Sequence, residues 1–343
     1  MTNSPVPPPS EVVDQGIPWH YGDPLREQRH LAAGGAAVDL SNRGVVTVSG
    51  PDRLSWLHSL TTQHLDALRP GGSSLALILS PHGHVEHELH LVDDGETTWI
   101  ITPPGSASDL ASYLRLMQFM LRVEVADRSS DFAVVWEPVW ATDDAVPTWL
   151  IPGDFAGRER VDAGSDRGGD AARYVPDRPD ALVGREVIVP RDDLASRLAV
   201  WPQQAGSWAL EALRVSAAVP RLGCETDHRT LPHEVGWVGP AVHLAKGCYR
   251  GQETVARVHN LGHPPRRLVL LHLDGSEEDL PAHGDVVRID GKDVGWVGSA
   301  AWHYEQGPLA TAVVKRSAPV DAAAEVVTSA GTVPASQVPV VVA

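Results

Sequence analysis

The chain is poor in cysteine and has no long apolar run. Cys224 and Cys248 are its only two cysteines, too few for a disulfide framework and typical of a reducing compartment. No apolar run approaches the roughly 20 residues that cross a bilayer, and the Val-rich stretch 338–343 is far shorter. The Pro-rich start, residues 1–10, has no basic segment followed by an apolar one, as a secretory signal would. We therefore expect a cytoplasmic protein without a membrane span.

Basic charge is also scarce. The sequence has 28 Lys and Arg against 44 Asp and Glu, a formal net charge of −16. Such a surface repels phosphates, so delocalised binding to nucleic acid is disfavoured. An apolar fraction of 43 % and 11 tryptophans supply enough material for a globular core. Because 343 residues exceed the usual size of one core, we expect two or three structural units.

Helix and strand patterns alternate along the chain without a strict β-α-β rhythm, which predicts an α+β fold. Residues 1–15 are expected to be a disordered, solvated tail, and the Gly/Asp/Arg-rich stretch from about 153 to 180 a long loop. Residues 16–265 then hold two α+β units, and only strand patterns follow from Arg266, which predicts a separate small β-barrel over 266–343. The predicted strands are 44–50, 74–79, 84–92, 132–136, 185–189, 268–273, 286–289, 294–297 and 309–314; the predicted helices are 51–60, 108–122, 192–200 with Asp192 as its cap, and 208–217.

The clearest functional signal is the segment Lys246-Gly-Cys-Tyr-Arg-Gly-Gln-Glu253. A loop with two glycines leads here into a helix predicted over 252–260, with Gly262 as its stop. Cys248 should therefore lie just before a helix N-terminus, where the dipole and the cations Lys246 and Arg250 favour a thiolate. The alternative is that Cys248 is a small buried hydrophobe, as many free cysteines are.

Five cations are concentrated around this segment, against one acid, Glu253. A strip of this kind attracts a carboxylate-rich ligand or a phosphate, unless its members pair with acids elsewhere in the chain. The five cations are Lys246, Arg250, Arg257, Arg266 and Arg267.

The segment 246–253 resembles the K-G-C-Y-x-G-Q-E signature of the YgfZ family, folate-binding relatives of the T-protein (aminomethyltransferase) of the glycine cleavage system, and every fixed position matches. Less specific similarity covers 39–44, 49–52 and 211–214. The resemblance implies two α+β units around a folate site, a C-terminal β-barrel, and tetrahydrofolate or a derivative as ligand. It also implies an accessory role in assembly or repair of iron–sulfur enzymes through the thiol of Cys248, with those enzymes or assembly proteins as partners. The folate-contacting residues that it implies are Lys246, Gly247, Tyr249, Arg250, Gly251, Gln252 and Glu253.

The sequence departs from the transferase pattern at two places. The T-protein has an aspartate near the reacting nitrogen of tetrahydrofolate, and the matching stretch here places His87 or Glu88 there. Strand alternation puts His87 on the apolar, inward face, so we take it as a folate contact, although a core histidine fits equally well. Ser216 replaces a glutamate that holds the pterin, and Glu234 is a candidate substitute. Loss of both acids disfavours the alternative function, a folate-dependent aminomethyl or one-carbon transferase.

A metal site is a weaker interpretation. Alternation places several ligand-type side chains on one strand face, but residues two apart on a strand lie roughly 7 Å from each other, too far to close a tetrahedral site alone. A solvated polar face is favoured, and we predict no metal ligands. Two cysteines also fall short of the four that usually hold an iron–sulfur cluster, and a Cys224–Cys248 disulfide stays open. The face in question carries His82, His84, Glu86, Glu88 and His90.

Overall fold

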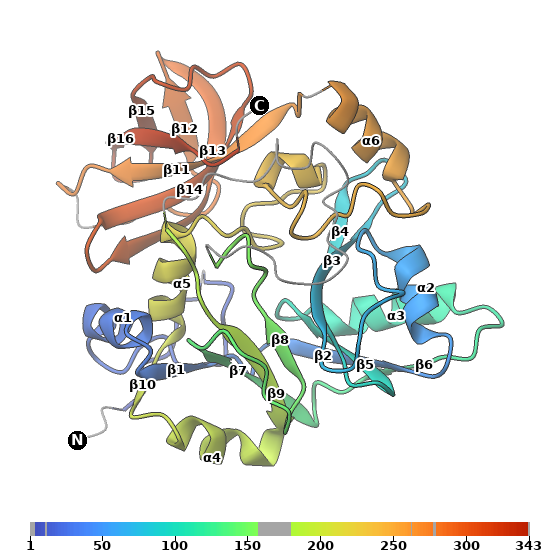
Figure 1. The fold of residues 1–343 in the computed structure, drawn as a ribbon. Coiled ribbons are helices and arrows are strands. Elements are labelled where there is room, and N and C mark those ends of the chain that lie inside the picture. The colour runs from blue at the N-terminus through green and yellow to red at the C-terminus, as the bar shows by residue number, and fades with distance from the viewer. Residues whose placement is uncertain (1–3, 11, 157–179, 262, 277–278, 342–343) are drawn as a thin grey trace.

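The structure, a computed structural model, describes residues 4–10, 12–156, 180–261, 263–276 and 279–341. Three units meet around a common centre: two five-stranded sheets and a closed barrel (Figure 1). The predicted α+β fold with a C-terminal barrel is confirmed. Among the described residues, no helix has the length and apolar character needed to span a bilayer.

The first sheet has the strand order β3-β4-β5-β2-β6 and is covered on one face by two helices. The helix predicted over 108–122 ends at Met117, because Phe119 has a positive φ of 47° that a helix cannot contain. The strands are β2 (Gly44–Ser49), β3 (Ser73–Leu79), β4 (Val85–Asp93), β5 (Thr97–Thr102) and β6 (Glu124–Asp127), and the helices are α2 (Arg53–Leu60) and α3 (Ala107–Met117).

The second sheet has the order β10-β1-β7-β9-β8, so an N-terminal strand lies among later ones. Asp192 does not cap the helix here: it lies inside a 3₁₀ turn, Arg191–Asp193, which the following helix continues. The strands are β1 (Ala36–Asp39), β7 (Phe132–Glu137), β8 (Thr148–Leu150), β9 (Arg185–Pro190) and β10 (Gln203–Ala205), and the helices are α1 (Pro24–Ala32), α4 (Leu194–Ala199) and α5 (Ser207–Ser216).

The barrel closes in the order β11-β14-β13-β12-β15-β16, and its first strand begins at Arg266. The predicted strand 294–297 is part of a longer one that continues through an irregularity between Val297 and Ala300. The last two strands were not predicted, because they have few apolar residues in alternation. The barrel strands are β11 (Arg266–Leu273), β12 (Val286–Ile289), β13 (Lys292–His303), β14 (Gly307–Lys315), β15 (Ala324–Val327) and β16 (Thr332–Pro339), and helix α6 (Gln252–Leu261) precedes them.

The N-terminal segment differs from the predicted disordered tail over 1–15. Val6 bridges His20, and Asp14 is only 4 % exposed because its carboxylate pairs with Arg221. The carboxylate of Asp14 can be buried because the guanidinium group of Arg221 neutralises its charge. Most of the loop predicted over about 153–180 lies outside the described residues, although Phe155 at its start is buried. Gly262, the predicted helix stop, also lies outside them.

Candidate functional site

A cavity of about 60 Å³ lies between the two sheets. Its walls come from both sheets, from α5 and from the segment that follows α5. Tryptophan rings and paired charges share the lining, which is the mixture expected where a polar, aromatic ligand is held. The residues that the following paragraphs use are Asp14, Arg43, Glu88, His90, Trp136, Trp149, Glu186, Glu211, Arg214 and Arg221.

One wall carries a chain of alternating charges. His90 lies between two buried carboxylates, with Nδ1 2.8 Å from Glu186 and Nε2 3.2 Å from Glu88. Arg43 binds the other oxygen of Glu186 at 2.7 Å, and the backbone N–H of Leu222 donates to Glu88 at 2.8 Å. With an acceptor on each ring nitrogen, the charged imidazolium satisfies both. The wall is therefore a preorganised ion chain.

The pKa values in this chain are set by burial and by the partners. Burial alone would lower the pKa of His90, but the carboxylates of Glu186 and Glu88 outweigh it and raise the pKa above the usual 6.5. Burial would raise the pKa values of Glu88 and Glu186, yet their hydrogen bonds and nearby cations hold both below 4.5. The partners therefore favour the charged form of all three groups.

This ion chain predicts a pH dependence that His90 controls. Because the folded pKa of His90 is raised, its stabilising contribution is complete below about pH 6.5 and is lost as the pH rises through the folded pKa. The free energy of unfolding of wild type should therefore exceed that of His90→Gln most at pH 6, and the difference should shrink toward pH 9. Urea titrations of both proteins across that range check this. A difference that is constant with pH would contradict the charged state of His90.

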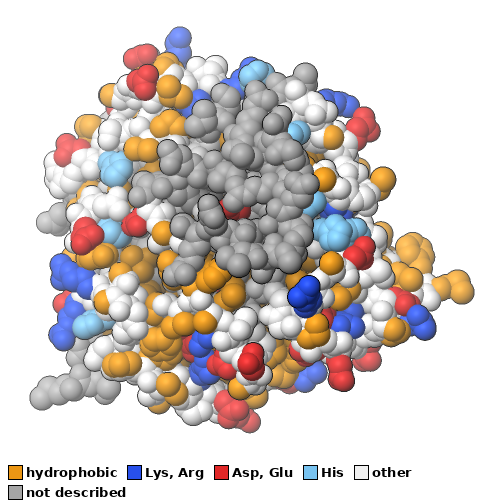
Figure 2. Space-filling model, viewed as in Figure 1, with side chains coloured by type: hydrophobic (Ala, Val, Ile, Leu, Met, Phe, Trp, Pro, Cys, Tyr) orange, Lys and Arg blue, Asp and Glu red, His pale blue; other side chains and the backbone are white. Residues whose placement is uncertain are grey.

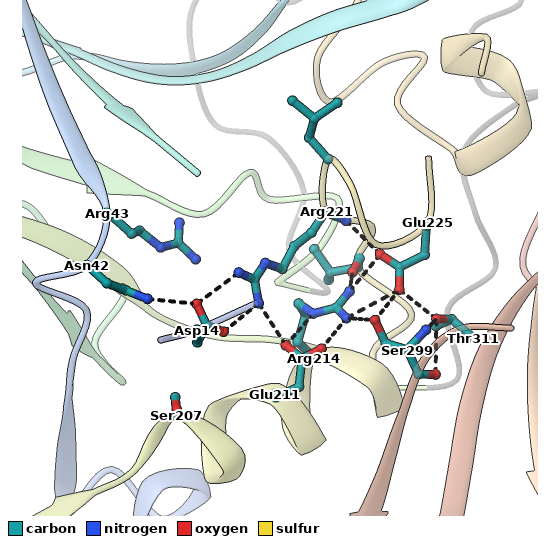
Figure 3. A network of polar contacts seen from close by, with 12 residues as sticks. Asp14, Asn42, Arg43, Ser207, Glu211, Arg214, Arg221, Glu225, Ser299 and Thr311 are labelled. Atoms are coloured by element: carbon teal, nitrogen blue, oxygen red, sulfur yellow. Dashed lines mark hydrogen bonds and ion pairs between the residues drawn. The ribbon is translucent and has the colours of Figure 1, made fainter. Parts of the chain in front are cut away.

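The opposite wall is an arginine network that reaches the barrel (Figure 3). Arg214 on α5 binds Glu211 through two hydrogen bonds of 2.8 and 2.5 Å and Glu225 at 3.1 Å. Glu225 in turn accepts hydrogen bonds from Ser299 on β13 at 2.7 Å and Thr311 on β14 at 2.6 Å. Burial would raise the pKa of Glu211, but Arg214 and Arg221 lower it to about 2. The network thus joins the cavity wall to the barrel through buried charges.

Strand β4 places His87 and Glu88 on opposite faces. His87 pairs with Ile78, which packs in the same apolar cluster as Leu89 and Leu91, so alternation gave its face correctly. Glu88 is 5 % exposed and lines the cavity, whereas His87 lies on the other face beside Tyr113, with ring centroids 5.8 Å apart. The apolar face thus packs under α2 and α3 and not on this cavity, and the folate contact of His87 stays a prediction.

The motif segment lies outside the cavity. Cys248 is exposed and lies four residues before the first residue of α6, in the loop that was predicted to lead into this helix, and Cys224 is a separate buried thiol, so the two form no disulfide. Burial raises the pKa of Cys224 to about 12. None of the folate-contacting residues predicted from the motif lines the cavity.

The motif loop is held by backbone contacts with the β3–β4 turn. Gly251 has a φ of +82°, and a Cβ there would lie 2.6 Å from the Ser80 carbonyl oxygen and 2.9 Å from the Cα of Gly83. Gly251 is thus required by both conformation and space. Gly247, in contrast, has no atom within 4 Å of an added Cβ.

The two motif glycines therefore predict unequal costs. Gly251→Ala should lower the free energy of unfolding by roughly 1–3 kcal/mol through backbone strain, with the clash against Ser80 adding to it. Gly247→Ala is the matched control and should stay within about 0.5 kcal/mol of wild type. Urea titration of the two variants measures both; equal costs would contradict the packing described for Gly251.

The predicted basic strip is not formed, because each cation has its own partner. Lys246 is buried, with burial lowering its pKa to about 8, and its ammonium group donates to backbone carbonyls. On the face shown in Figure 2, Lys and Arg side chains stand in separate small groups among acids. The pairs are Lys246 with the carbonyls of His58, Thr61 and Gln63; Arg250 with Glu86; Arg257 with Glu253; Arg266 with Asp227 and Glu234; and Arg267 with the carbonyls of Lys315, Arg316 and Ala318.

The remaining predicted site residues have structural partners. Tyr249 is buried in the core, and Gln252 donates to the carbonyl of Lys246 at 3.3 Å. Glu234 is fully buried, accepts a hydrogen bond from the Leu231 N–H at 2.9 Å and pairs with Arg266, and it does not line the cavity. Ser216 is buried and donates to the Leu213 carbonyl.

The ligand-type side chains of β4 are not gathered at one point. Glu86 pairs with Arg250 outside, while Glu88 and His90 face the cavity. The described part of the chain has no group of three or more His, Cys, Asp or Glu placed to hold a metal ion.

Sequence reasoning missed most of the cavity. Arg43, Glu186 and Arg221 were not singled out, and Glu211 and Arg214 entered only through the resemblance. One signal was available: Glu186 is an acid inside the apolar strand β9, a position that demands a buried cation.

Comparisons with known proteins agree with this architecture. Residues 11–136 match the family model described as the GCVT N-terminal domain. The chain is 25 % identical over 308 residues to the aminomethyltransferase of Bacillus subtilis, covering 84 % of this chain and 82 % of that one. It is also 25 % identical over 276 residues to a putative chloroplastic transferase of Arabidopsis thaliana, covering 76 % of this chain but only 61 % of the plant protein.

The fold of the chain is similar to that of a solved aminomethyltransferase. Aminomethyltransferase T of the glycine cleavage system from Bartonella henselae superposes with a TM-score of 0.71 at 18 % identity, covering 93 % of this chain and 90 % of that one. This likeness shows a shared fold, with two five-stranded sheets and a closed C-terminal barrel in this chain.

Proposed function

We propose that this protein binds tetrahydrofolate or a derivative in the central cavity and acts as an accessory protein of the YgfZ type. The observation that supports this proposal best is the charged, tryptophan-lined cavity between the two sheets and α5, in a fold similar to that of an aminomethyltransferase. Aminomethyltransferases use tetrahydrofolate, which makes a folate the first ligand to test.

The cavity residues suit a folate chemically. Trp136 and Trp149 offer rings on which a pterin can stack, and the carboxylates of Glu88 and Glu211 are acceptors for its N–H groups. Among the described residues, the buried Nε of Arg43 has no hydrogen-bond partner, so a donor faces the site unused. Bound tetrahydrofolate would supply a carrier of one-carbon units; the protein would bind, orient and shield it from water.

The accessory role rests on Cys248. Its exposed thiol lies outside the cavity, so it is accessible to a protein partner. We propose iron–sulfur enzymes or their assembly proteins as these partners, on the strength of the motif 246–253. Cys248 would act as the functional thiol of that interaction.

A folate-dependent aminomethyl or one-carbon transferase is the second candidate. Glu88 favours it, because β4 places this carboxylate inside the cavity where the sequence alone suggested a lost acid. Its engagement by His90 and Leu222 disfavours it, since a carboxylate held by two donors is a weak base.

Anaerobic calorimetric titration with tetrahydrofolate tests the proposal on wild type, Glu88→Gln and Cys248→Ala. We expect binding by wild type and Cys248→Ala with equal affinity, and at least about tenfold weaker binding by Glu88→Gln, because a charged acceptor is lost. In a deletion strain, Cys248→Ala should fail to restore iron–sulfur enzyme activity.

Two outcomes would redirect the assignment. No tetrahydrofolate binding by wild type would remove the folate function. Formation of 5,10-methylenetetrahydrofolate from an aminomethyl donor, lost in Glu88→Gln and retained in Cys248→Ala, would establish the transferase instead.

A further inference from the structure

The N-terminal segment brings an acidic side chain into the cavity wall from outside both sheets. Asp14 is 4 % exposed and lines the cavity. Its two oxygens receive Arg221 Nη1 at 2.8 Å and Nη2 at 3.0 Å, and Asn42 Nδ2 at 3.2 Å. This fork-to-fork geometry is the one by which arginine holds a ligand carboxylate.

The groups around Asp14 have unused hydrogen-bonding capacity. Within the described chain, the buried Nε of Arg43 and the buried Oδ1 of Asn42 have no partner. Figure 3 shows Arg43, Asn42 and Arg221 together around Asp14. Burial would raise the pKa of Asp14, but Arg221 and, to a smaller extent, Arg43 lower it below its usual range. Two guanidinium groups thus face one carboxylate, and one donor stays unsatisfied.

The segment is anchored on the C-terminal side of Asp14. Ile17 is buried in the core, and the N–H groups of Ser207 and Trp208 donate to the carbonyls of Pro18 and Trp19. Gln15, next to Asp14, donates only to carbonyls of the same segment, those of Pro9 and Val12. Once Asp14 is released by Arg221 and Asn42, residues 12–16 can therefore move away from the cavity while residues 17–20 stay in place.

Release of Asp14 leaves no arginine unpaired. Arg221 also binds Glu211 at 3.1 Å, and Arg43 binds Glu186 at 2.7 Å. The cavity, at about 60 Å³, is smaller than the roughly 300 Å³ at which small-molecule sites begin. A ligand of that size therefore requires part of the cavity wall to move. Asp14 is in the part of the wall that the N-terminal segment forms.

We propose that Arg43, Asn42 and Arg221 form a carboxylate-binding subsite and that Asp14 occupies it until a ligand carboxylate displaces it. The ligand class is a molecule with a terminal carboxylate; that this molecule is a folate, with its glutamate group in the subsite, rests on the proposed function. Asp14 is then a built-in competitor that sets the affinity for such ligands.

Calorimetric titration of the full chain with four probes tests this: tetrahydrofolate, p-aminobenzoylglutamate and glutarate, which carry carboxylates, and 6-methyltetrahydropterin, which does not. Asp14→Asn removes the competing charge. The affinity for the three carboxylate probes should therefore rise about tenfold, and the affinity for the pterin should not change. Asp23→Asn, a charge-matched control at the exposed N-cap of α1, should change none.

Hydrogen exchange of wild type provides a readout without a variant. Amides of residues 12–16 should exchange faster with saturating glutarate than without it, because Asp14 is released. Unchanged or weaker carboxylate binding by Asp14→Asn, or unchanged exchange at 12–16 with glutarate bound, would overturn the subsite.

The two proposals fail in different ways. Glutarate binding that Asp14→Asn tightens, without binding of tetrahydrofolate or the pterin, would keep the subsite and remove the folate function. Tetrahydrofolate binding that is equal in wild type and Asp14→Asn would keep the folate function and remove the subsite. No binding by any probe would remove both.

Discussion

Replacing Arg214 by Met should lower the free energy of unfolding by about 3–5 kcal/mol. Arg214 is 5 % exposed and neutralises Glu211 and the fully buried Glu225. Methionine fills similar space but leaves both carboxylates without this cation, so each keeps the cost of burial. Because Glu225 also binds two barrel strands, the loss should loosen the joint between α5 and the barrel. Urea titration and calorimetry measure the effect.

Arg257→Met is the matched control. Arg257 pairs with Glu253 at 3.1 Å, but both side chains are exposed, at 65 % and 89 %, so the variant should cost no more than about 0.5 kcal/mol. Arg214→Lys should fall between the two, because an ammonium cannot reproduce the bidentate contact with Glu211. A loss below about 1 kcal/mol for Arg214→Met would show that the network is dispensable for stability.

Trp149→Ala should cost a similar amount, about 3–5 kcal/mol, and should enlarge the cavity. Trp149 is 3 % exposed, stacks on His90 with ring centroids 3.8 Å apart, and donates its Nε1–H to the Ser74 carbonyl at 3.0 Å. The substitution removes this contact area, the hydrogen bond and the ring that faces the charged imidazolium. The free energy of unfolding from urea titration checks the prediction.

Trp208→Ala is the control for the loss of a tryptophan outside the cavity wall. Trp208 stacks on Trp19 with centroids 5.5 Å apart but is only partly buried, so we expect a smaller cost, about 1 kcal/mol. Trp149→Phe should recover much of the loss, since a ring remains on His90. Equal costs for the two alanine variants would contradict a special role for Trp149 in the cavity wall.

Much of the fold follows from local pattern. The strand at 44–49, the helix beginning at Gln252 and the start of the barrel at Arg266 were all predictable, because periodicity and glycine turns are local. The placement of β1 in the second sheet was not, because its neighbours β7 and β10 are distant in sequence. The end of α3 depends on one residue, Phe119, whose left-handed backbone no propensity predicts.

The site was harder to predict than the fold. Alternation along β4 correctly separated His87 from Glu88, but nothing local says which face meets a cavity. A cluster such as Asp14, Glu211 and Arg221 is assembled from segments about 200 residues apart, so only the tertiary structure reveals that these charges pair. The motif 246–253 was predictable as a feature and as a helix start, while the partners of Lys246 and Arg266 were not.

Strand β4 has a practical consequence for experiments on this protein. One end of it holds the cysteine loop, through Glu86 and Arg250, while Glu88, only two positions further, belongs to the cavity. Because the two side chains belong to one strand, we expect a ligand that displaces Glu88 to displace Glu86 as well. Cys224 is buried and Cys248 is exposed. The rate at which a chromogenic thiol reagent modifies the native Cys248 should therefore report ligand binding in the cavity, with no label engineered into the chain.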